Sequence, residues 1–60
     1  MRLLHSDGRE VNTGDIVWKR RKSYIFLSID GTQVEVKTTD DRRMFVRGNY
    51  SEFNLTLEAL

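Results

Sequence analysis

The sequence predicts an all-β fold, a small antiparallel barrel of five or six short strands in a single domain over residues 1–60. Short apolar runs are separated by turn residues about every 8–12 positions, which is the spacing of small antiparallel barrels. The strongest signal lies at residues 24–38, where Asp30 and Gly31 stand between two alternating runs, the pattern of a tight β-hairpin. Sixty residues are near the lower limit for a self-sufficient core, so stability must come from a compact barrel, from self-association or from a partner.

The central hairpin sets the expected faces of the sheet. With Asp30 and Gly31 as a two-residue turn, side chains alternate between the two faces in one fixed register. The expected inner face is apolar on both strands and consists of Ile25, Leu27, Ile29, Val34 and Val36. The expected outer face carries two aromatic residues, Tyr24 and Phe26, opposite polar residues of the second strand.

The segments before the hairpin predict three short elements, each bounded by turn residues. They are a hairpin over residues 2–11 with its turn at Asp7 and Gly8, a turn over residues 12–15, and a strand over residues 15–19. Four consecutive basic residues follow at positions 19–22. Because such a run repels itself and has no apolar anchor, we expect an exposed loop there.

The stretch RMFVR after the hairpin predicts another strand, with two registers open. A three-residue loop before it places Met44 and Val46 inside and sets Arg47 opposite Glu35, a favourable cross-strand pair. A two-residue turn places Phe45 inside instead. We favour the first register, because it keeps two apolar side chains inside and both arginines outside.

The C-terminal segment predicts a single helical turn followed by a last strand. Asn49 and Glu52 have the spacing of a capping box, which marks a helix start. The apolar positions that then alternate, as in a strand, are Phe53, Leu55 and Leu57. Phe53, Leu57 and Leu60 are also spaced as on one face of a helix, so a C-terminal helix stays an alternative.

Composition excludes several classes of chemistry. The chain has no cysteine, which excludes disulfides, thiolate zinc sites and iron–sulfur clusters, and its one histidine, His5, cannot form a histidine metal cluster. Most acidic residues stand in turns, and no serine or threonine has a base partner other than His5. A barrel of this size has little room for a small-molecule pocket. We therefore expect no enzymatic activity, no metal and no cofactor.

Charge and hydropathy bear on location and partners. The formal net charge is +1, so the chain as a whole has no general attraction to nucleic acid or membrane. No apolar run approaches the roughly 20 residues that span a bilayer, and the start has no long apolar segment of a secretory signal. We expect a cytoplasmic protein that does not bind membranes.

Two sets of residues are candidates for binding. The candidates for a protein partner are aromatic: Trp18, Tyr24, Phe26 and Phe45. The candidates for nucleic acid are basic: Lys19, Arg20, Arg21, Lys22, Arg43 and Arg47. In the favoured register Tyr24, Lys37 and Phe45 form one row across three strands, and Phe26, Glu35 and Arg47 form the next. Aromatic and cationic side chains on a sheet surface suit single-stranded nucleic acid, although Glu35 inside the patch opposes this interpretation.

The opening pattern Asp7-Gly8-x-x-Val11-x-x-Gly14-Asp15-x-Val17 resembles the start of SH3-like and KOW-type barrels, where a Gly-Asp turn delivers a valine into the core. With the stretch YIFLSIDGTQVEV and the ending EFNLTL, the chain is similar to small SH3-like barrel proteins encoded by bacteriophages and prophages. The resemblance implies an SH3-like barrel with a one-turn helix before the last strand, Val17 inside and Trp18 at least partly outside. The basic run departs from the KOW pattern, which has a glycine soon after this strand.

The resemblance also implies a setting, the cytoplasm of a bacterial host cell, but no activity, because the group is largely without assigned function. We predict a small accessory binding module that acts through a protein–protein surface on a host or phage protein. A nucleic-acid-binding module is the alternative. A homodimer, formed through an edge strand or exposed aromatics, and a structural role without a ligand also stay open.

Overall fold

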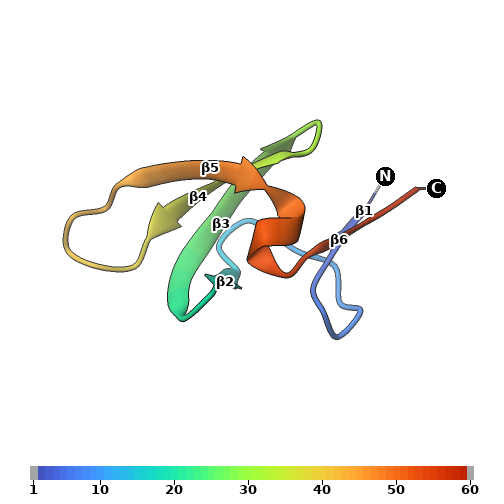
Figure 1. Cartoon of the computed structure of the whole chain (residues 1–60), viewed down its shortest axis with the longest axis horizontal. Helices are drawn as coiled ribbons and strands as arrows, with labels where there is room; N and C mark the ends of the chain where they lie inside the picture. The colour runs from blue at the N-terminus through green and yellow to red at the C-terminus, as the bar shows by residue number, and fades with distance from the viewer. Residues whose placement is uncertain (1, 60) are drawn as a thin grey trace.

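Two antiparallel sheets make up the fold (Figure 1). The structure, a computed structural model, describes residues 2–59. The larger sheet has the strand order β2-β3-β4-β5, and the smaller sheet pairs β1 with β6. In chain order the elements are β1 (Arg2–Leu4), β2 (Ile16–Lys19), β3 (Lys22–Asp30), β4 (Gln33–Thr38), β5 (Phe45–Asn49), the 3₁₀ helix η1 (Tyr50–Phe53) and β6 (Thr56–Glu58).

The predicted all-β antiparallel class is confirmed, but the described strands do not close into a barrel. Closure requires the two edge strands of the larger sheet, β2 and β5, to pair with further strands. Strands β1 and β6 instead pair with each other, in the register Leu3 opposite Leu57. Both β2 and β5 therefore remain edge strands within residues 2–59.

The hairpin of β3 and β4 forms where it was predicted, with a different register. Asp30 pairs with Gln33, so the two turn residues are Gly31 and Thr32 rather than Asp30 and Gly31. Gly31 has φ 62°, a left-handed conformation that glycine adopts without a steric cost. Toward the other end of β3 the register shifts again between Phe26 and Ser28, a bulge that leaves one extra residue in β3.

The bulge at Leu27 inverts the predicted faces of the first half of β3. One extra residue exchanges inside and outside for every residue beyond it. Tyr24 and Phe26 are consequently buried, with 8% and 5% of their surface exposed, while Ile25 lies opposite Lys37 on the other face. The predicted placement of Ile25 and Leu27 inside was therefore wrong. The bulged backbone is held by Thr13, whose hydroxyl donates to the Leu27 carbonyl at 2.9 Å.

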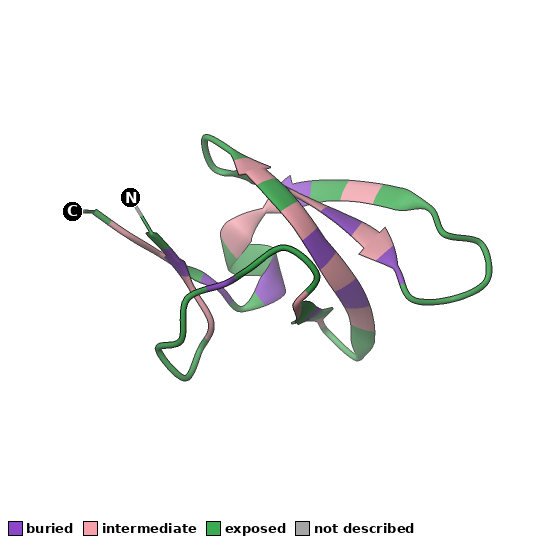
Figure 2. Cartoon of the chain, turned by 180° about the vertical axis from the view of Figure 1, so that it is seen from behind, coloured by how far each residue is buried: buried purple, intermediate pink, exposed green. Residues whose placement is uncertain are grey.

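The core lies between the larger sheet, the β1–β6 pair and η1. Buried and partly buried residues alternate along β3 (Figure 2). Val34 and Val36 are fully buried, as predicted, and Phe53 of η1 packs against Tyr24 edge to face, with ring centroids 5.6 Å apart. The buried apolar residues are Leu3, Val11, Val17, Tyr24, Phe26, Val34, Val36, Phe53 and Leu55.

Strand β5 follows the favoured register in part. Arg47 lies opposite Glu35, and its Nε is 3.0 Å from the Glu35 carboxylate, which confirms the cross-strand pair. Val46 is partly buried against the core, as predicted. The predicted placement of Met44 inside was wrong, and Met44 is exposed. The reason is that the β4–β5 connection is six residues long, so β5 begins only at Phe45.

The predicted cap and last strand are both confirmed. The Asn49 carboxamide accepts from the Ser51 N–H, and the Glu52 carboxylate accepts from the Asn49 N–H at 2.9 Å, a complete capping box. The helix stops after one turn at Asn54, which has φ 59°. The chain then pairs with β1 as a strand, so the alternative of a C-terminal helix is excluded over the described residues.

The basic run is exposed at Arg20, Arg21 and Lys22, as predicted, but it forms a tight hairpin turn instead of a loop. Lys19 is the last residue of β2 and Lys22 the first of β3, and the two residues pair across the hairpin. Only Arg20 and Arg21 form the turn. Alternation along β2 places Val17 inside, with 2% of its surface exposed, and leaves Trp18 51% exposed, as the resemblance to SH3-like barrels implied.

Candidate functional site

The basic residues fall into two groups, those in ion pairs and those without. Four of the ten pair with a carboxylate: Arg2 with Glu58, Arg9 with Asp7, Lys19 with Glu52, and Arg47 with Glu35. The remaining six make no ion pair within residues 2–59; they are Arg20, Arg21, Lys22, Lys37, Arg42 and Arg43, and we call them the basic end.

The topology brings these six residues to one end of the larger sheet. The β2–β3 turn precedes β3, and the β4–β5 loop follows β4; because the strands are antiparallel, the start of β3 lies beside the end of β4. Tyr24 pairs with Thr38, and the hydroxyls of Ser23 and Thr39 lie 2.9 Å apart. A turn and a loop that are about 20 residues apart in sequence therefore adjoin.

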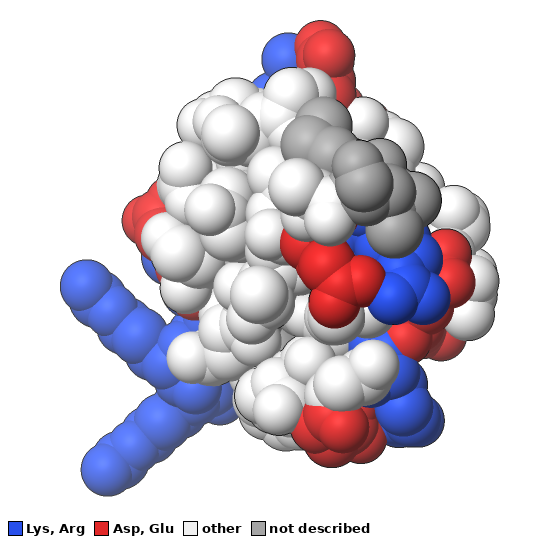
Figure 3. All heavy atoms as spheres, turned by 90° about the vertical axis from the view of Figure 1, so that its right-hand side faces the viewer, with Lys and Arg blue, Asp and Glu red and all other residues white. Residues whose placement is uncertain are grey.

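Positive and negative charge are separated between this end of the larger sheet and the rest of the molecule. The six residues of the basic end and the two acidic residues of the β4–β5 loop, Asp40 and Asp41, together have a formal charge of +4, and the rest of the chain carries −3. Away from the basic end, on the face that carries the two chain ends, acidic and basic side chains adjoin around an uncharged area (Figure 3). A net charge of +1 therefore conceals a polar distribution.

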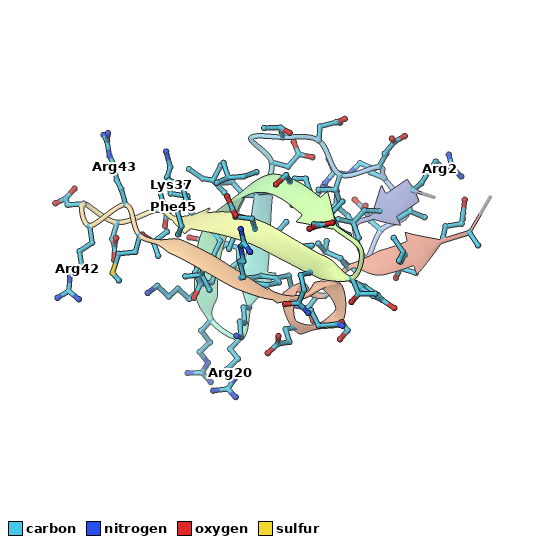
Figure 4. All side chains as sticks on the ribbon, turned by 90° about the horizontal axis from the view of Figure 1, so that it is seen from above. Arg2, Arg20, Lys37, Arg42, Arg43 and Phe45 are labelled. Atoms are coloured by element: carbon cyan, nitrogen blue, oxygen red, sulfur yellow. The ribbon has the colours of Figure 1, made fainter. Side chains whose placement is uncertain are left out.

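The cations of the basic end project in more than one direction (Figure 4). Lys37, Arg43 and Phe45 lie together at the loop end and project to the same side, whereas Arg42 and Arg20 project to the opposite side. Arg2, which is ion-paired, lies at the far end of the molecule. The group on one side thus combines an aromatic ring with two cations.

We call the side of the larger sheet that carries Phe45 the outer face. Its clearest row crosses all four strands and consists of Ile16, Ile25, Lys37 and Phe45, since these residues pair directly from strand to strand. Trp18 lies in the next row, opposite Ser23. Phe45 is 68% exposed, the highest value for any large apolar residue within residues 2–59.

The aromatic candidates separate into two pairs. Trp18 and Phe45 are exposed on the two edge strands of the outer face, about three strand spacings or roughly 14 Å apart. Tyr24 and Phe26 are buried core residues, so the predicted rows that included them do not form. The physical reason is the bulge in β3.

The basic candidates separate in the same way. Arg20, Arg21, Lys22 and Arg43 belong to the basic end, as defined above. Lys19 and Arg47 do not, because each is held by a carboxylate, Lys19 by Glu52 at 3.3 Å and Arg47 by Glu35 at 3.0 Å. Since Glu35 is matched by Arg47, it contributes no net negative charge beside Lys37.

Two residues of the basic end, Lys37 and Arg42, were not among the predicted site residues. Lys37 was placed in a row with Tyr24, and only the corrected register pairs it with Ile25. Arg42 was assigned to a connecting loop. The sequence did contain a signal for them. In an antiparallel hairpin the start of the first strand lies beside the end of the second, so the connections before and after the hairpin meet at one end of the sheet.

Two arginines of the basic end adopt backbone conformations that disfavour a side chain. Arg20 has φ 59° and Arg43 has φ 49°, both in the left-handed region, where glycine or asparagine is usual. The third such residue outside glycine within residues 2–59 is Asn54. A long cationic side chain is thus retained at two turn positions where it costs stability.

The carboxylate of Asp40, in the β4–β5 loop, accepts hydrogen bonds from residues in and beside the same loop. The Asp40 carboxylate accepts from the Thr38 hydroxyl at 2.9 Å and from the Arg42 N–H at 3.0 Å. The Thr38 hydroxyl, followed by the Arg42 N–H, holds the pKa of Asp40 below its usual value. Asp40 therefore stays ionised and orders the loop that presents Arg42 and Arg43.

The single histidine has a structural role. Its Nε2 lies 3.0 Å from the Asp15 carboxylate, which also accepts from the Asn12 N–H and so links the first hairpin to the following turn. The Asn12 N–H and then His5 hold the pKa of Asp15 below its usual value. No hydroxyl within residues 2–59 is hydrogen-bonded to His5.

Two clefts contradict the expectation that so small a fold has little room for a pocket. One, of about 360 Å³, lies between His5, Trp18 and Phe53, and the other, of about 400 Å³, lies beside Glu35 and Arg47. Neither contains three His, Cys, Asp or Glu residues placed to hold a metal ion, and the described residues form no such group elsewhere.

No helix within residues 2–59 is long and apolar enough to cross a membrane. The chain matches no protein-family model, no curated protein and no solved structure.

Proposed function

We propose that the chain is a non-enzymatic binding module for single-stranded nucleic acid, which binds at the basic end and the adjoining part of the outer face. The observation that carries the proposal is the gathering of the six cations that make no ion pair within residues 2–59 at the sheet end that also bears Phe45. Phosphates are recognised by unpaired Lys and Arg, and bases stack on exposed aromatic rings.

The roles of individual residues follow from their positions. Phe45 offers a ring for one base, with Lys37 directly opposite it on β4 and Arg43 two residues before it. Arg20 and Arg42 project to the opposite side of the same end and, with Arg21 of the same turn as Arg20, would contact phosphates further along the strand. The left-handed φ of Arg20 and Arg43 supports the proposal, because strained residues concentrate at functional sites.

A protein partner is the second candidate, and a separate observation favours it. Trp18 and Ile16 are about half exposed on β2, and they adjoin Ile25 on the outer face. Aromatic residues of this kind are frequent binding hot spots. We rank this candidate second because two of its four predicted aromatic residues, Tyr24 and Phe26, are buried.

We further propose that the two sheets are an open form of an SH3-like barrel. The support is a one-turn helix directly before the last strand and the Gly-Asp turn that precedes the buried Val17. The bacterial cytoplasm and a phage or prophage origin rest on the sequence resemblance alone.

The test is fluorescence anisotropy with a labelled oligothymidylate and an oligouridylate, each of about 20 nucleotides, at low salt. Phe45→Ala should weaken binding by about tenfold, because one stacked base contributes about 1–3 kcal/mol. Met44→Ala is the matched control, since Met44 is the neighbouring exposed apolar residue but precedes β5 and is not part of the row that contains Phe45.

Charge provides an independent comparison. The double variant Arg20→Ala and Arg21→Ala should lose most of the affinity, whereas Arg2→Ala with Arg9→Ala, which removes two ion-paired arginines, should change it little. If both double variants bind alike, or Met44→Ala weakens binding as much as Phe45→Ala, the proposed site is wrong. If these variants have no effect and Trp18→Ala instead abolishes capture of a protein partner, the second candidate replaces nucleic-acid binding.

A further inference from the structure

Strand β5 is an edge strand, and two hydrogen bonds fix how its backbone is oriented. Beyond one end of the β4–β5 ladder the Thr38 N–H donates to the Met44 carbonyl at 2.9 Å. Beyond the other end the Tyr50 N–H donates to the Thr32 carbonyl at 3.1 Å. Hydrogen-bonded and non-hydrogen-bonded residue pairs alternate along an antiparallel ladder. The two bonds, one at each end, fix the same set of hydrogen-bonded pairs between β4 and β5.

This alternation determines which backbone groups of β5 face away from the sheet. Val46 directs its N–H and carbonyl toward β4, whereas Phe45 and Arg47 direct theirs to the open side. Asn49 also faces the open side, but its N–H is taken by the Glu52 carboxylate. The open edge is therefore three residues long, and an edge with unpaired groups is a template for another strand.

We infer that the chain forms a homodimer in which the β5 strands of two copies pair antiparallel, with the two-fold axis at Val46. In this register Phe45 of each copy lies opposite Arg47 of the other. Both residues with open N–H and carbonyl groups are then hydrogen-bonded, two pairs in all. The same three residues serve both copies, as a two-fold interface requires.

The side chains of the outer face fit this register. Phe45 is the most exposed large apolar residue described, and in the dimer the guanidinium of Arg47 from the other copy stands beside its ring, a favourable cation–π arrangement. Glu35 already holds that guanidinium, with both Nε and Nη2 at 3.0 Å from one carboxylate oxygen. The two Phe45 side chains become diagonal neighbours, about 7–8 Å apart.

The charge distribution selects a second copy in this orientation. Each copy carries +4 at the basic end and −3 elsewhere. Antiparallel pairing places the basic end of each copy beside the oppositely charged remainder of the other, with Arg43 opposite Asn49 and close to the start of η1. A parallel pairing would bring the two basic ends together. Both proposals use Phe45, but dimerisation needs no ligand and is measured without nucleic acid, so its outcome is separate from that of the proposed function.

Single cysteines test the register directly, because the natural chain has none. Val46→Cys places two cysteines across the two-fold axis in a non-hydrogen-bonded pair, where Cα atoms are about 4.5 Å apart and a disulfide can form. Trp18→Cys, on the other edge strand of the same sheet, is the matched control. We expect oxidised dimer to form at least about ten times faster with Val46→Cys, because pairing raises the effective concentration.

Sedimentation of the natural chain without nucleic acid supplies the second measurement. We expect concentration-dependent dimer between about 10 µM and 1 mM, the range of small interfaces. Phe45→Lys, which faces Arg47 with a like charge, should stay monomeric, and Trp18→Lys should still dimerise. Equal cross-linking of the two cysteine variants, or a monomeric natural chain at about 1 mM, would overturn the inference.

Discussion

At the scale of single residues, Arg20 and Arg43 have a left-handed backbone conformation that lowers folding stability, although each adds a positive charge to the basic end. Arg20 occupies a two-residue turn between β2 and β3, a position where glycine or asparagine serves better. An L-residue with a side chain pays about 1 kcal/mol or more for this conformation. Retention of arginine there is consistent with a role for its charge.

Arg20→Gly should therefore stabilise the fold by about 0.5–1 kcal/mol, as measured by urea unfolding, while it weakens oligothymidylate binding. Arg21→Gly is the control, because Arg21 carries the same charge in the same turn but has no positive φ. It should weaken binding to a similar degree without any gain in stability. Equal stability effects of the two variants would remove the argument from strain.

Phe53 is the residue on which the core depends most. It is 1% exposed, contacts Tyr24 edge to face and has the Lys19 ammonium 5.7 Å from its ring centroid. Phe53→Ala should cost about 3–5 kcal/mol, close to the whole stability of about 3–9 kcal/mol expected for 60 residues. We expect that variant to lose its cooperative thermal transition by circular dichroism, and Phe53→Leu to keep it. A Phe53→Ala variant that melts within a few degrees of the natural chain would contradict this packing.

At the scale of elements, carboxylates hold the turns and the cap, and this predicts how stability depends on pH. Four carboxylates have pKa values lowered by such bonds: Asp7, Asp15, Asp40 and Glu52. For Glu52 the largest cause is the Asn49 N–H, followed by Lys19. These groups bind protons more weakly in the folded chain than in the unfolded chain. Their contribution to folding stability is therefore present above the ordinary pKa values of 3.8 for Asp and 4.5 for Glu, and it is lost as pH falls through the lowered pKa values.

The free energy of unfolding should thus decrease steadily as pH falls from about 5 toward 2, measured by urea titration at each pH. Glu52→Gln should lower stability at pH 7 and flatten this dependence, since it removes one of the four groups. Glu58→Gln is the comparison, because Glu58 is ion-paired on β6 but caps no turn or helix. A natural chain with constant stability over this range would show that the caps contribute nothing.

The elements also show how far the sequence predicts this fold. Turn dipeptides, the capping box and the alternation after Phe53 each depend on neighbours in sequence, so the hairpin, η1 and β6 were predictable. The bulge at Leu27 was not, because it satisfies a distant group, the Thr13 hydroxyl, and allows two aromatic rings to enter the core. One extra residue then changed which side chains face outward.

The candidate site was predictable to the same extent. The basic run and Phe45 were identified from local pattern alone; all of the run but Lys19 belongs to the basic end, and Phe45 adjoins it. Its completion by Lys37 and Arg42 depends on which strand ends adjoin, which required the register of β3 against β4. The open barrel depends on β1 pairing with β6 across almost the full chain length, a contact that no local pattern specifies.

At the scale of the whole molecule, separation of charge is the property that connects the fold to the proposed function. An antiparallel sheet with two connections at one end collects there the six cations that make no ion pair within residues 2–59, next to the ion-paired Lys19. The field at that end is therefore much stronger than the net charge of +1 indicates. This end, rather than the chain as a whole, should therefore contact phosphates.

The salt dependence of oligothymidylate binding measures that contact most directly. For single strands each neutralised phosphate contributes about −0.7 to the slope of log K against log salt concentration, so about four to six contacts give a slope near −3 to −4. Arg20→Ala with Arg21→Ala should reduce its magnitude by about 1.4, and Arg2→Ala with Arg9→Ala should leave it unchanged. No binding at low salt, or one slope shared by all three proteins, would contradict the account.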